Sequence, residues 1–99
     1  MKVIIENGNP VVAKLQGRLD TAAAVEVTPD FQALNQLAAG HIIVDCAELE
    51  YISSSGLRLF LALRKEVASK GGQLQIRAIS EDIRQIFTMT GFISLFEIL

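Results

Sequence analysis

Three consecutive serines, Ser53, Ser54 and Ser55, stand between two apolar runs of this sequence. A serine hydroxyl can attack a substrate when a base lies within hydrogen-bond reach, or it can receive a phosphoryl group from another protein. The one histidine, His41, opens the apolar run that precedes the serines. Because a strand rises about 3.3 Å per residue, most of its length separates that imidazole from the hydroxyls. A catalytic Ser–His pair is therefore disfavoured, and we predict no catalytic residue.

Metal and cofactor chemistry are disfavoured as well. Cys46 and His41 fall on one expected strand with side chains on opposite faces, and no carboxylate cluster completes a ligand set. Gly71-Gly72 lacks the lysine and the spacing of a phosphate-binding loop. Cys46 lies in an apolar run and is predicted to be a buried, inert thiol. We therefore expect neither a metal site nor a cofactor.

The composition narrows the function further. Of the 99 residues, 51% are hydrophobic and 20% are charged, which indicates a folded globular chain. This length predicts a single domain spanning residues 1–99. The net charge of -2, with scattered lysines and arginines, disfavours direct contact with nucleic acid or an anionic membrane. No run approaches the roughly 20 apolar residues of a membrane span, and the start lacks a signal-peptide core, so we expect a cytoplasmic location. By elimination, the sequence favours a protein-binding module.

The N-terminal part predicts a hairpin followed by a broken helix. Two β-branched runs flank the turn residues Asn7–Pro10. Residues 21–40 are expected to be helical in two pieces, with Thr28 as the N-cap of the second piece and proline at its first position. The sequence leaves residues 22–27 open, and one option is a separate turn of helix that Pro29 ends.

The rest of the chain alternates strands with helices. The pattern predicts a buried strand at His41–Cys46, followed by a polar loop with Glu48 and Glu50. A helix at Leu57–Ala68, a strand at Gln73–Ile79 and a helix capped by Ser80 are expected next. The apolar tail at Phe92–Leu99 is expected to be a last strand or a docked segment. The order β-β-α-β-α-β-α-β predicts an α/β fold, a single compact domain with a mixed β-sheet and helical crossovers. The sequence does not fix the oligomeric state, although an uncovered tail could support self-association.

The serine cluster lies in the expected loop between the buried strand and the next helix. One serine is therefore predicted to be the N-cap of that helix, which leaves the other two unexplained. A phosphate here would carry roughly -1.5 to -2 charges at neutral pH, beside free amide donors and the positive end of the helix dipole. The fold would tolerate that phosphate, while the surface offered to a partner would become strongly anionic. The cluster is thus a candidate switch for protein binding.

Four short motifs, in order and over essentially the whole chain, resemble the STAS domain family of bacterial anti-sigma factor antagonists. Tyr51–Leu57 is similar to the family's D-S-[ST]-G-L motif, and Gly17–Asp20 resembles its G-x-L-D element. Gly71–Leu74 resembles its G-G-x-[LM] turn. Ile83–Phe87 with Thr90-Gly91 resembles its last helix. The resemblance implies a STAS-like domain over residues 1–99.

The resemblance also implies a partner and a modification site. Antagonists of this family bind an anti-sigma factor that is also a serine kinase, and phosphorylation of a loop serine by that kinase ends the binding. Matched position by position, the modified serine is Ser54, Ser55 is the following Ser/Thr, and Gly56 is the glycine that lets the backbone turn. Asp20 matches an aspartate near the partner surface, and it is either a partner contact or an ordinary cap before Thr21.

Two positions depart from the family pattern. Ser53 replaces the usual aspartate, which puts kinase recognition in question. Arg58 stands where the family often has glycine, about one helical turn after the serines. It either neutralises a phosphate on Ser54 or is an ordinary solvated arginine. The residues predicted to bind the partner are Asp20, Ser53, Ser54, Ser55, Gly56 and Arg58.

The change at Ser53 also favours a second interpretation. A STAS domain without a phosphorylation cycle could serve as a cytoplasmic accessory subunit of a membrane transporter for a lipid or an anion. A small serine hydrolase is a third class and the least favoured. The first interpretation, an anti-sigma factor antagonist, is not an enzyme and requires no cofactor.

Overall fold

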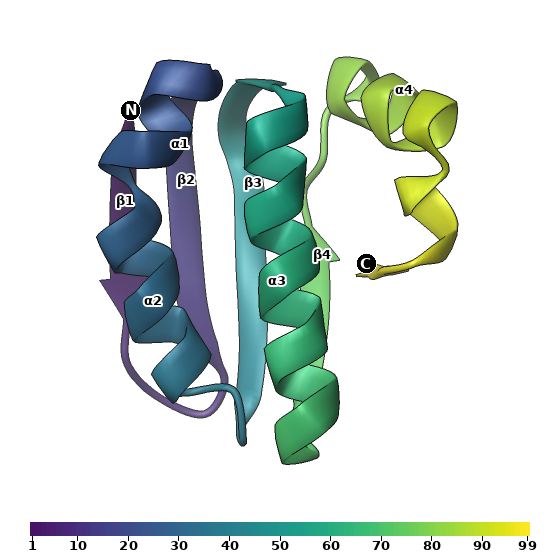
Figure 1. Cartoon of the computed structure of the whole chain (residues 1–99). Coiled ribbons are helices and arrows are strands. Elements are labelled where there is room, and N and C mark those ends of the chain that lie inside the picture. The colour runs from purple at the N-terminus through teal and green to yellow at the C-terminus, as the bar shows by residue number, and fades with distance from the viewer.

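The computed structural model describes all 99 residues and contains a five-stranded sheet in the order β1-β2-β3-β4-β5 (Figure 1). β1 (Lys2–Glu6) and β2 (Val11–Leu19) form an antiparallel hairpin around a turn whose Asn9–Pro10 peptide bond is cis. β3 (His41–Ile52), β4 (Gln73–Arg77) and β5 (Glu97–Ile98) continue the sheet in parallel with β2. The predicted α/β fold with a mixed sheet is confirmed.

The helices lie mainly on one face of this sheet. α1 (Thr21–Glu26), α2 (Thr28–Gln36) and α3 (Ser54–Lys70) stand in front of the strands in Figure 1. α4 (Glu81–Thr90) and the 3-10 turn η1 (Phe92–Ser94) follow β4 and lie beside α3. Over residues 11–16 of β2 the side chains alternate between buried and half-buried, as expected for a sheet with one covered face.

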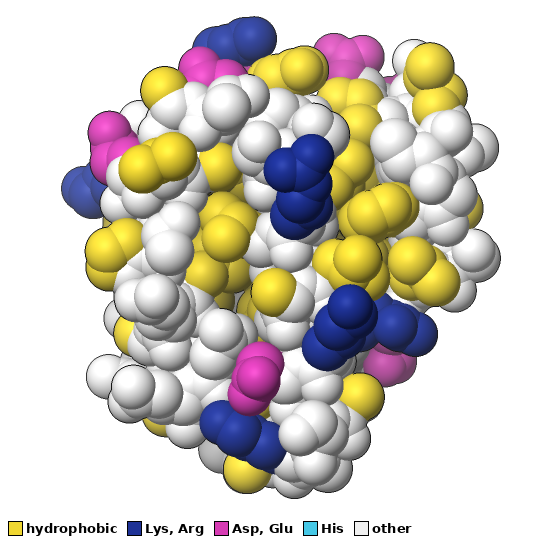
Figure 2. Space-filling model, viewed as in Figure 1, with side chains coloured by type: hydrophobic (Ala, Val, Ile, Leu, Met, Phe, Trp, Pro, Cys, Tyr) yellow, Lys and Arg dark blue, Asp and Glu magenta, His cyan; other side chains and the backbone are white.

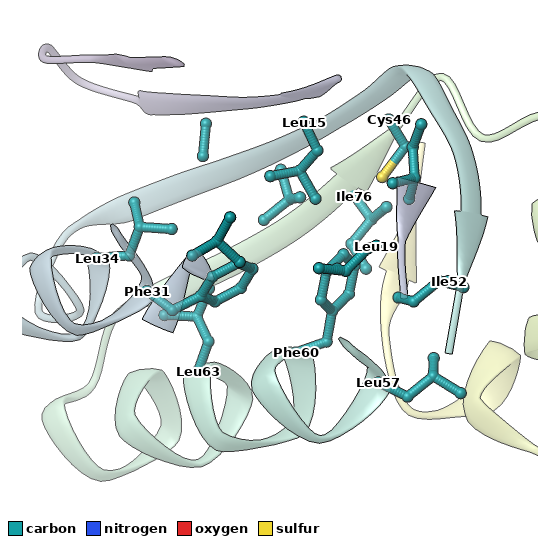
Figure 3. Packing of buried hydrophobic residues seen from close by; sticks show 14 of the residues in the cluster. Leu15, Leu19, Phe31, Leu34, Cys46, Ile52, Leu57, Phe60, Leu63 and Ile76 are labelled. Atoms are coloured by element: carbon teal, nitrogen blue, oxygen red, sulfur yellow. The ribbon is translucent and has the colours of Figure 1, made fainter. Parts of the chain in front are cut away.

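The core is one continuous apolar cluster between the sheet and the helices (Figure 3). Phe60 of α3 lies at its centre. Its ring centroid is 5.8 Å from that of Phe31 on α2, 6.1 Å from that of Phe87 on α4 and 6.2 Å from that of Phe96 in the C-terminal segment. Aromatic pairs at these separations stabilise beyond the area that they bury. One side chain of α3 therefore ties three other segments together.

The broken helix is present, but its caps differ from the prediction. Residues 21–26 form α1, which settles the segment that the sequence left open. The N-cap of α2 is Val27 rather than Thr28, and the helix ends at Gln36. The hydroxyl of Thr28 instead donates to the carbonyl of Ala24 at 2.7 Å. Because α1 runs almost directly into α2, that carbonyl at the end of α1 competes for the hydroxyl that was expected to cap α2.

β3 is twice the predicted length, and this overturns the predicted polar loop. Glu48 and Glu50 are exposed residues of the strand itself. The prediction missed them because β3 shifts register against β2 at two irregularities, which interrupts a simple alternation of buried and exposed residues. α3 likewise begins at Ser54 and ends at Lys70, beyond both ends of the predicted helix.

The remaining predictions largely agree with the structure. Ser80 caps α4, accepting from the amide of Ile83 at 3.2 Å, and Gly71 and Gly91 end their helices in the left-handed conformation. The strand predicted to reach Ile79 stops at Arg77. Cys46 is fully buried. Burial, with a smaller contribution from Asp45, raises the pKa of its thiol to about 12, so the thiol stays protonated at neutral pH.

Candidate functional site

The predicted site residues meet at the carboxyl ends of β2 and β3. These strands are parallel neighbours, with Leu19 opposite Ile52 at their last pair. Asp20 follows the first strand and Ser53 follows the second. The amide of Ser53 donates to the carbonyl of Leu19 at 2.8 Å, which locks the two strand ends together. Loops at the carboxyl ends of parallel strands are a common place for recognition sites, since the sheet holds them rigidly.

Ser53 is the serine that caps α3. Its backbone is extended, and its Oγ accepts from the amide of Gly56 at 3.2 Å. The residue is only 8% exposed. Serine and aspartate are equally good N-caps, so the serine preserves the helix start while removing a negative charge. Its hydroxyl therefore has a structural function in this conformation.

Ser54 occupies the first position of α3 and is exposed, whereas Ser55 is half-buried. The amide of Gly56 is satisfied by the cap and that of Leu57 donates to the carbonyl of Ser53 at 2.9 Å. The amides of Ser54 and Ser55 are the free donors of the first turn. An accessible hydroxyl thus lies next to amides that favour an anion, which is the arrangement that the sequence predicted.

Gly56 has a different purpose from the predicted one. It lies in the first turn of α3 with an ordinary helical backbone, so its freedom to adopt unusual backbone angles is not used here. A methyl group on this residue would lie 2.7 Å from Cγ of Leu19 and 2.9 Å from Cγ1 of Ile52. The absence of a side chain lets α3 approach the ends of β2 and β3 closely, and this contact sets the position of the serines.

Asp20 caps α1. Its Oδ1 accepts from the amide of Ala23 at 2.8 Å, and the residue remains exposed. The ordinary cap that the sequence offered as one alternative is therefore present. A partner contact is compatible with it, because only one of the two carboxylate oxygens is used and the other faces away from that bond.

A shallow groove of about 210 Å³ runs between α1 and α3 beside the serines. We call it the α1–α3 groove; it is lined by Thr21, Ala24, Val25, Thr28, Ser55, Arg58 and Leu59. Figure 2 shows hydrophobic side chains on this helical face, with a basic group over the N-terminal half of α3. Arg58 is exposed and forms neither an ion pair nor a side-chain hydrogen bond. It is therefore available to an anionic group.

Sequence reasoning missed the α1 wall of this groove. Val25 is 75% exposed although it follows two buried alanines. The signal was present: once Asp20 caps a helix, Ala23 and Ala24 take the inward face and Val25 turns outward. Val25 thereby adds an exposed apolar side chain to the groove that Ser55 and Arg58 also line. The partner-binding role predicted for the six site residues and the phosphorylation of Ser54 remain predictions.

Removing the Ser53 cap tests how the site is built. Ser53→Ala is expected to lower the free energy of unfolding by about 1–2 kcal/mol, because the amide of Gly56 loses its buried acceptor. Ser53→Asp, the matched control, keeps an acceptor and should cost less. Urea denaturation of the two variants and the wild type measures the difference. Equal loss in both variants would show that the cap does not stabilise the loop.

Comparison with known proteins gives the family. The sequence model of the STAS domain matches residues 1–99, so the chain belongs to the STAS domain family. BtrV of Bordetella bronchiseptica is 30% identical over 88 residues, which cover 89% of this chain and 76% of that protein. The anti-sigma-B factor antagonist of Bacillus subtilis is 25% identical over 93 residues, covering 94% and 84% of the two chains.

A solved structure agrees with this assignment. The chain is similar to the Bacillus cell fate determinant SpoIIAA in its phosphorylated form, with a TM-score of 0.72 and 25% sequence identity. The match covers 99% of this chain and 91% of that one.

None of the helices described here combines the length and apolar character needed to cross a bilayer.

Proposed function

We propose that this protein is an anti-sigma factor antagonist that binds an anti-sigma factor with serine-kinase activity. Phosphorylation of Ser54 by that kinase ends the binding and so switches the antagonist off. The protein is then a cytoplasmic regulator of transcription and not an enzyme. It acts through a protein partner, without touching DNA and without a cofactor.

The observation that carries this proposal is the position of Ser54. Its side chain is exposed at the first position of α3, while the neighbouring Ser53 is buried and occupied as the cap. The hydrogen bond from the amide of Ser53 to the carbonyl of Leu19 fixes the loop on the end of β2, and α3 packs closely on the strand ends at Gly56. A kinase can therefore reach one hydroxyl on a rigid support, and the added phosphate meets free amides.

The relatives support the same function. Among those at similar levels of identity are proteins named anti-sigma F factor antagonist and anti-sigma-B factor antagonist. SpoIIAA, the structural neighbour, exists in a phosphorylated form. These names belong to the relatives, and we extend their function to this chain because it shares their domain family and the fold of SpoIIAA.

We further propose that Asp20, Ser55 and Arg58 complete the partner surface, and that the buried Ser53 and Gly56 contribute to binding by holding this surface in position. Asp20 and the serines share one edge of the sheet, and Arg58 lines the α1–α3 groove next to Ser55. Arg58 has no acidic partner within the chain, and it lies one turn along the helix from Ser54. It can therefore offset part of the charge of a phosphate on Ser54. The first turn of α3 contains no cation, so Arg58 is the first positive side chain along the helix.

The test is phosphorylation by the cognate anti-sigma kinase. Incubated with that kinase and ATP, the wild-type protein is expected to gain the mass of one phosphoryl group. Ser54→Ala should abolish the gain, whereas Ser55→Ala should retain it. Ser53→Ala should also be modified, provided that circular dichroism shows it folded. Intact-mass spectrometry of the wild type and the three variants measures the added phosphate. A phosphate that is still added to Ser54→Ala would refute the assignment of Ser54 as the modified residue.

A second candidate is favoured by Ser53 itself. Because an uncharged cap replaces the aspartate of the family motif, this loop could have lost recognition by a kinase. The protein would then be an unphosphorylated STAS subunit associated with a membrane transporter. Wild-type protein that gains no phosphate from the kinase, yet co-purifies with transporter subunits from its own cells, would support this candidate over the first.

A further inference from the structure

β1 forms one margin of the sheet, with β2 on its inner side and no strand on its outer side (Figure 1). Its five residues pair with β2 in a single unbroken register, from Lys2 opposite Gln16 to Glu6 opposite Val12. No proline or bulge interrupts it. The opposite margin, β5, has only two residues. β1 is thus the one edge long enough to pair with another strand, since an open edge presents free N–H and C=O groups.

The sequence of β1, Lys2-Val3-Ile4-Ile5-Glu6, is complementary to itself in the antiparallel direction. When two copies are centred on Ile4, each Lys2 lies opposite a Glu6 and each Val3 lies opposite an Ile5. Opposite charges placed directly across two strands stabilise the pair, and like charges destabilise it. A parallel arrangement would instead bring Lys2 beside Lys2. The charges therefore select one direction and one register.

Within one chain, Glu6 has an ion-pair partner but Lys2 has none. The Nζ of Lys14 lies 3.4 Å from Oε2 of Glu6, so Glu6 already has a cation on its inner side. Lys2 is exposed and forms no ion pair. Between them, the three apolar residues of β1 are only half-buried. A second copy would supply the missing acid for Lys2 and would cover these apolar residues.

We propose that two copies of this chain associate through their β1 strands, antiparallel and centred on Ile4, so that the two sheets become one. The two-fold axis is then perpendicular to the sheet, and the helices of both copies lie on the same face. The carboxyl ends of the parallel strands point in opposite directions in the two copies. Each Ser54 site stays open, and the association does not depend on the function proposed for that site.

The apolar tail is a weaker candidate for the same contact. Phe96 is buried, with its ring centroid 5.9 Å from that of Phe87, and Phe92 is half-buried. Glu97–Ile98 pairs with β4. The tail is therefore docked on its own chain, and Leu95 and Leu99 are the large apolar side chains that it leaves exposed.

Sedimentation equilibrium of the full chain, without an N-terminal tag, tests the proposal. The wild type is expected to dimerise reversibly between about 10 µM and 1 mM, because a single strand pair is a small interface. Lys2→Glu and Glu6→Lys each place two like-charge pairs across the dyad and should raise the dimer dissociation constant about tenfold or more. An equimolar mixture of these two variants restores both opposite-charge pairs and should dimerise again.

Lys65→Glu is the matched control, because Lys65 is exposed on α3, forms no ion pair and undergoes the same change of charge. It should dimerise like the wild type, and thermal melts should show all variants folded. A wild type that stays monomeric up to about 1 mM would overturn the proposal. So would single variants that dimerise as well as the wild type, or a mixture that gains nothing over either variant alone.

Discussion

Gly72→Ala is expected to lower the free energy of unfolding by about 3 kcal/mol or more. A methyl group on Gly72 would overlap the carbonyl oxygen of Ala38 and would lie 2.5 Å from that of Gly40. Both obstacles are backbone atoms, so no side chain can rotate away. The turn after α3 and the turn after α2 are joined here by a 3.0 Å hydrogen bond from the amide of Gln73 to the carbonyl of Gly40. The substitution must push these two turns apart.

The neighbouring glycine provides the control for this prediction. Gly71 has a φ of +74°, but no atom lies within 4 Å of the methyl group that alanine would add. Gly71→Ala therefore costs only the left-handed backbone, roughly 1 kcal/mol. Urea denaturation of both variants measures the difference, against a typical domain stability of about 5–15 kcal/mol. If the two substitutions lower the free energy of unfolding equally, the close approach at Gly72 does not contribute to the stability of the fold.

This pair of glycines also shows where sequence reasoning stops. The pattern correctly placed a helix end at Gly71-Gly72, since two glycines after an apolar helix are a local signal. Only Gly71 adopts the left-handed C-cap. The importance of Gly72 comes from Ala38 and Gly40, which are far away in the sequence. Gly56 is similar in part, because Leu19 is far away in the sequence at the end of β2, although Ile52 of β3 is only four residues before Gly56.

Local signals explain why most of the fold was predictable. The hairpin turn, a serine cap for the helix after the serine cluster, the cap at Ser80 and the alternation of strands with helices each depend on a few adjacent residues. Thr28 failed as a cap because its hydroxyl found a carbonyl one turn back in α1. For the site, the serine loop was predicted, but the groove wall at Val25 was missed, because its signal depends on a helix that starts after Asp20 and the sequence left that segment open.

Phosphorylation of Ser54 is expected to weaken binding of the anti-sigma partner by about 100-fold. The phosphate adds nearly two negative charges at the centre of the proposed surface, where the unmodified loop is neutral and hydroxylic. Like charges or unpaired charges buried in an interface cost several kcal/mol. Titration calorimetry with the phosphorylated and unmodified proteins measures the change. Ser54→Ala should bind within a few-fold of the unmodified wild type, and equal affinity of the two wild-type forms would contradict the switch.

The same phosphate should leave the fold intact, because free amides of the first turn of α3 and the dipole of this 17-residue helix stabilise it. We expect the phosphorylated protein to melt no lower than the unmodified one. Arg58→Ala should lower the melting temperature of the phosphorylated form more than that of the unmodified form, since only the former presents an anion to the guanidinium. Lys65→Ala, further along α3, is the matched control and should affect both forms alike. An equal effect of Arg58→Ala on both forms would leave Arg58 as a solvated arginine and would assign the tolerance of the phosphate to the helix amides alone.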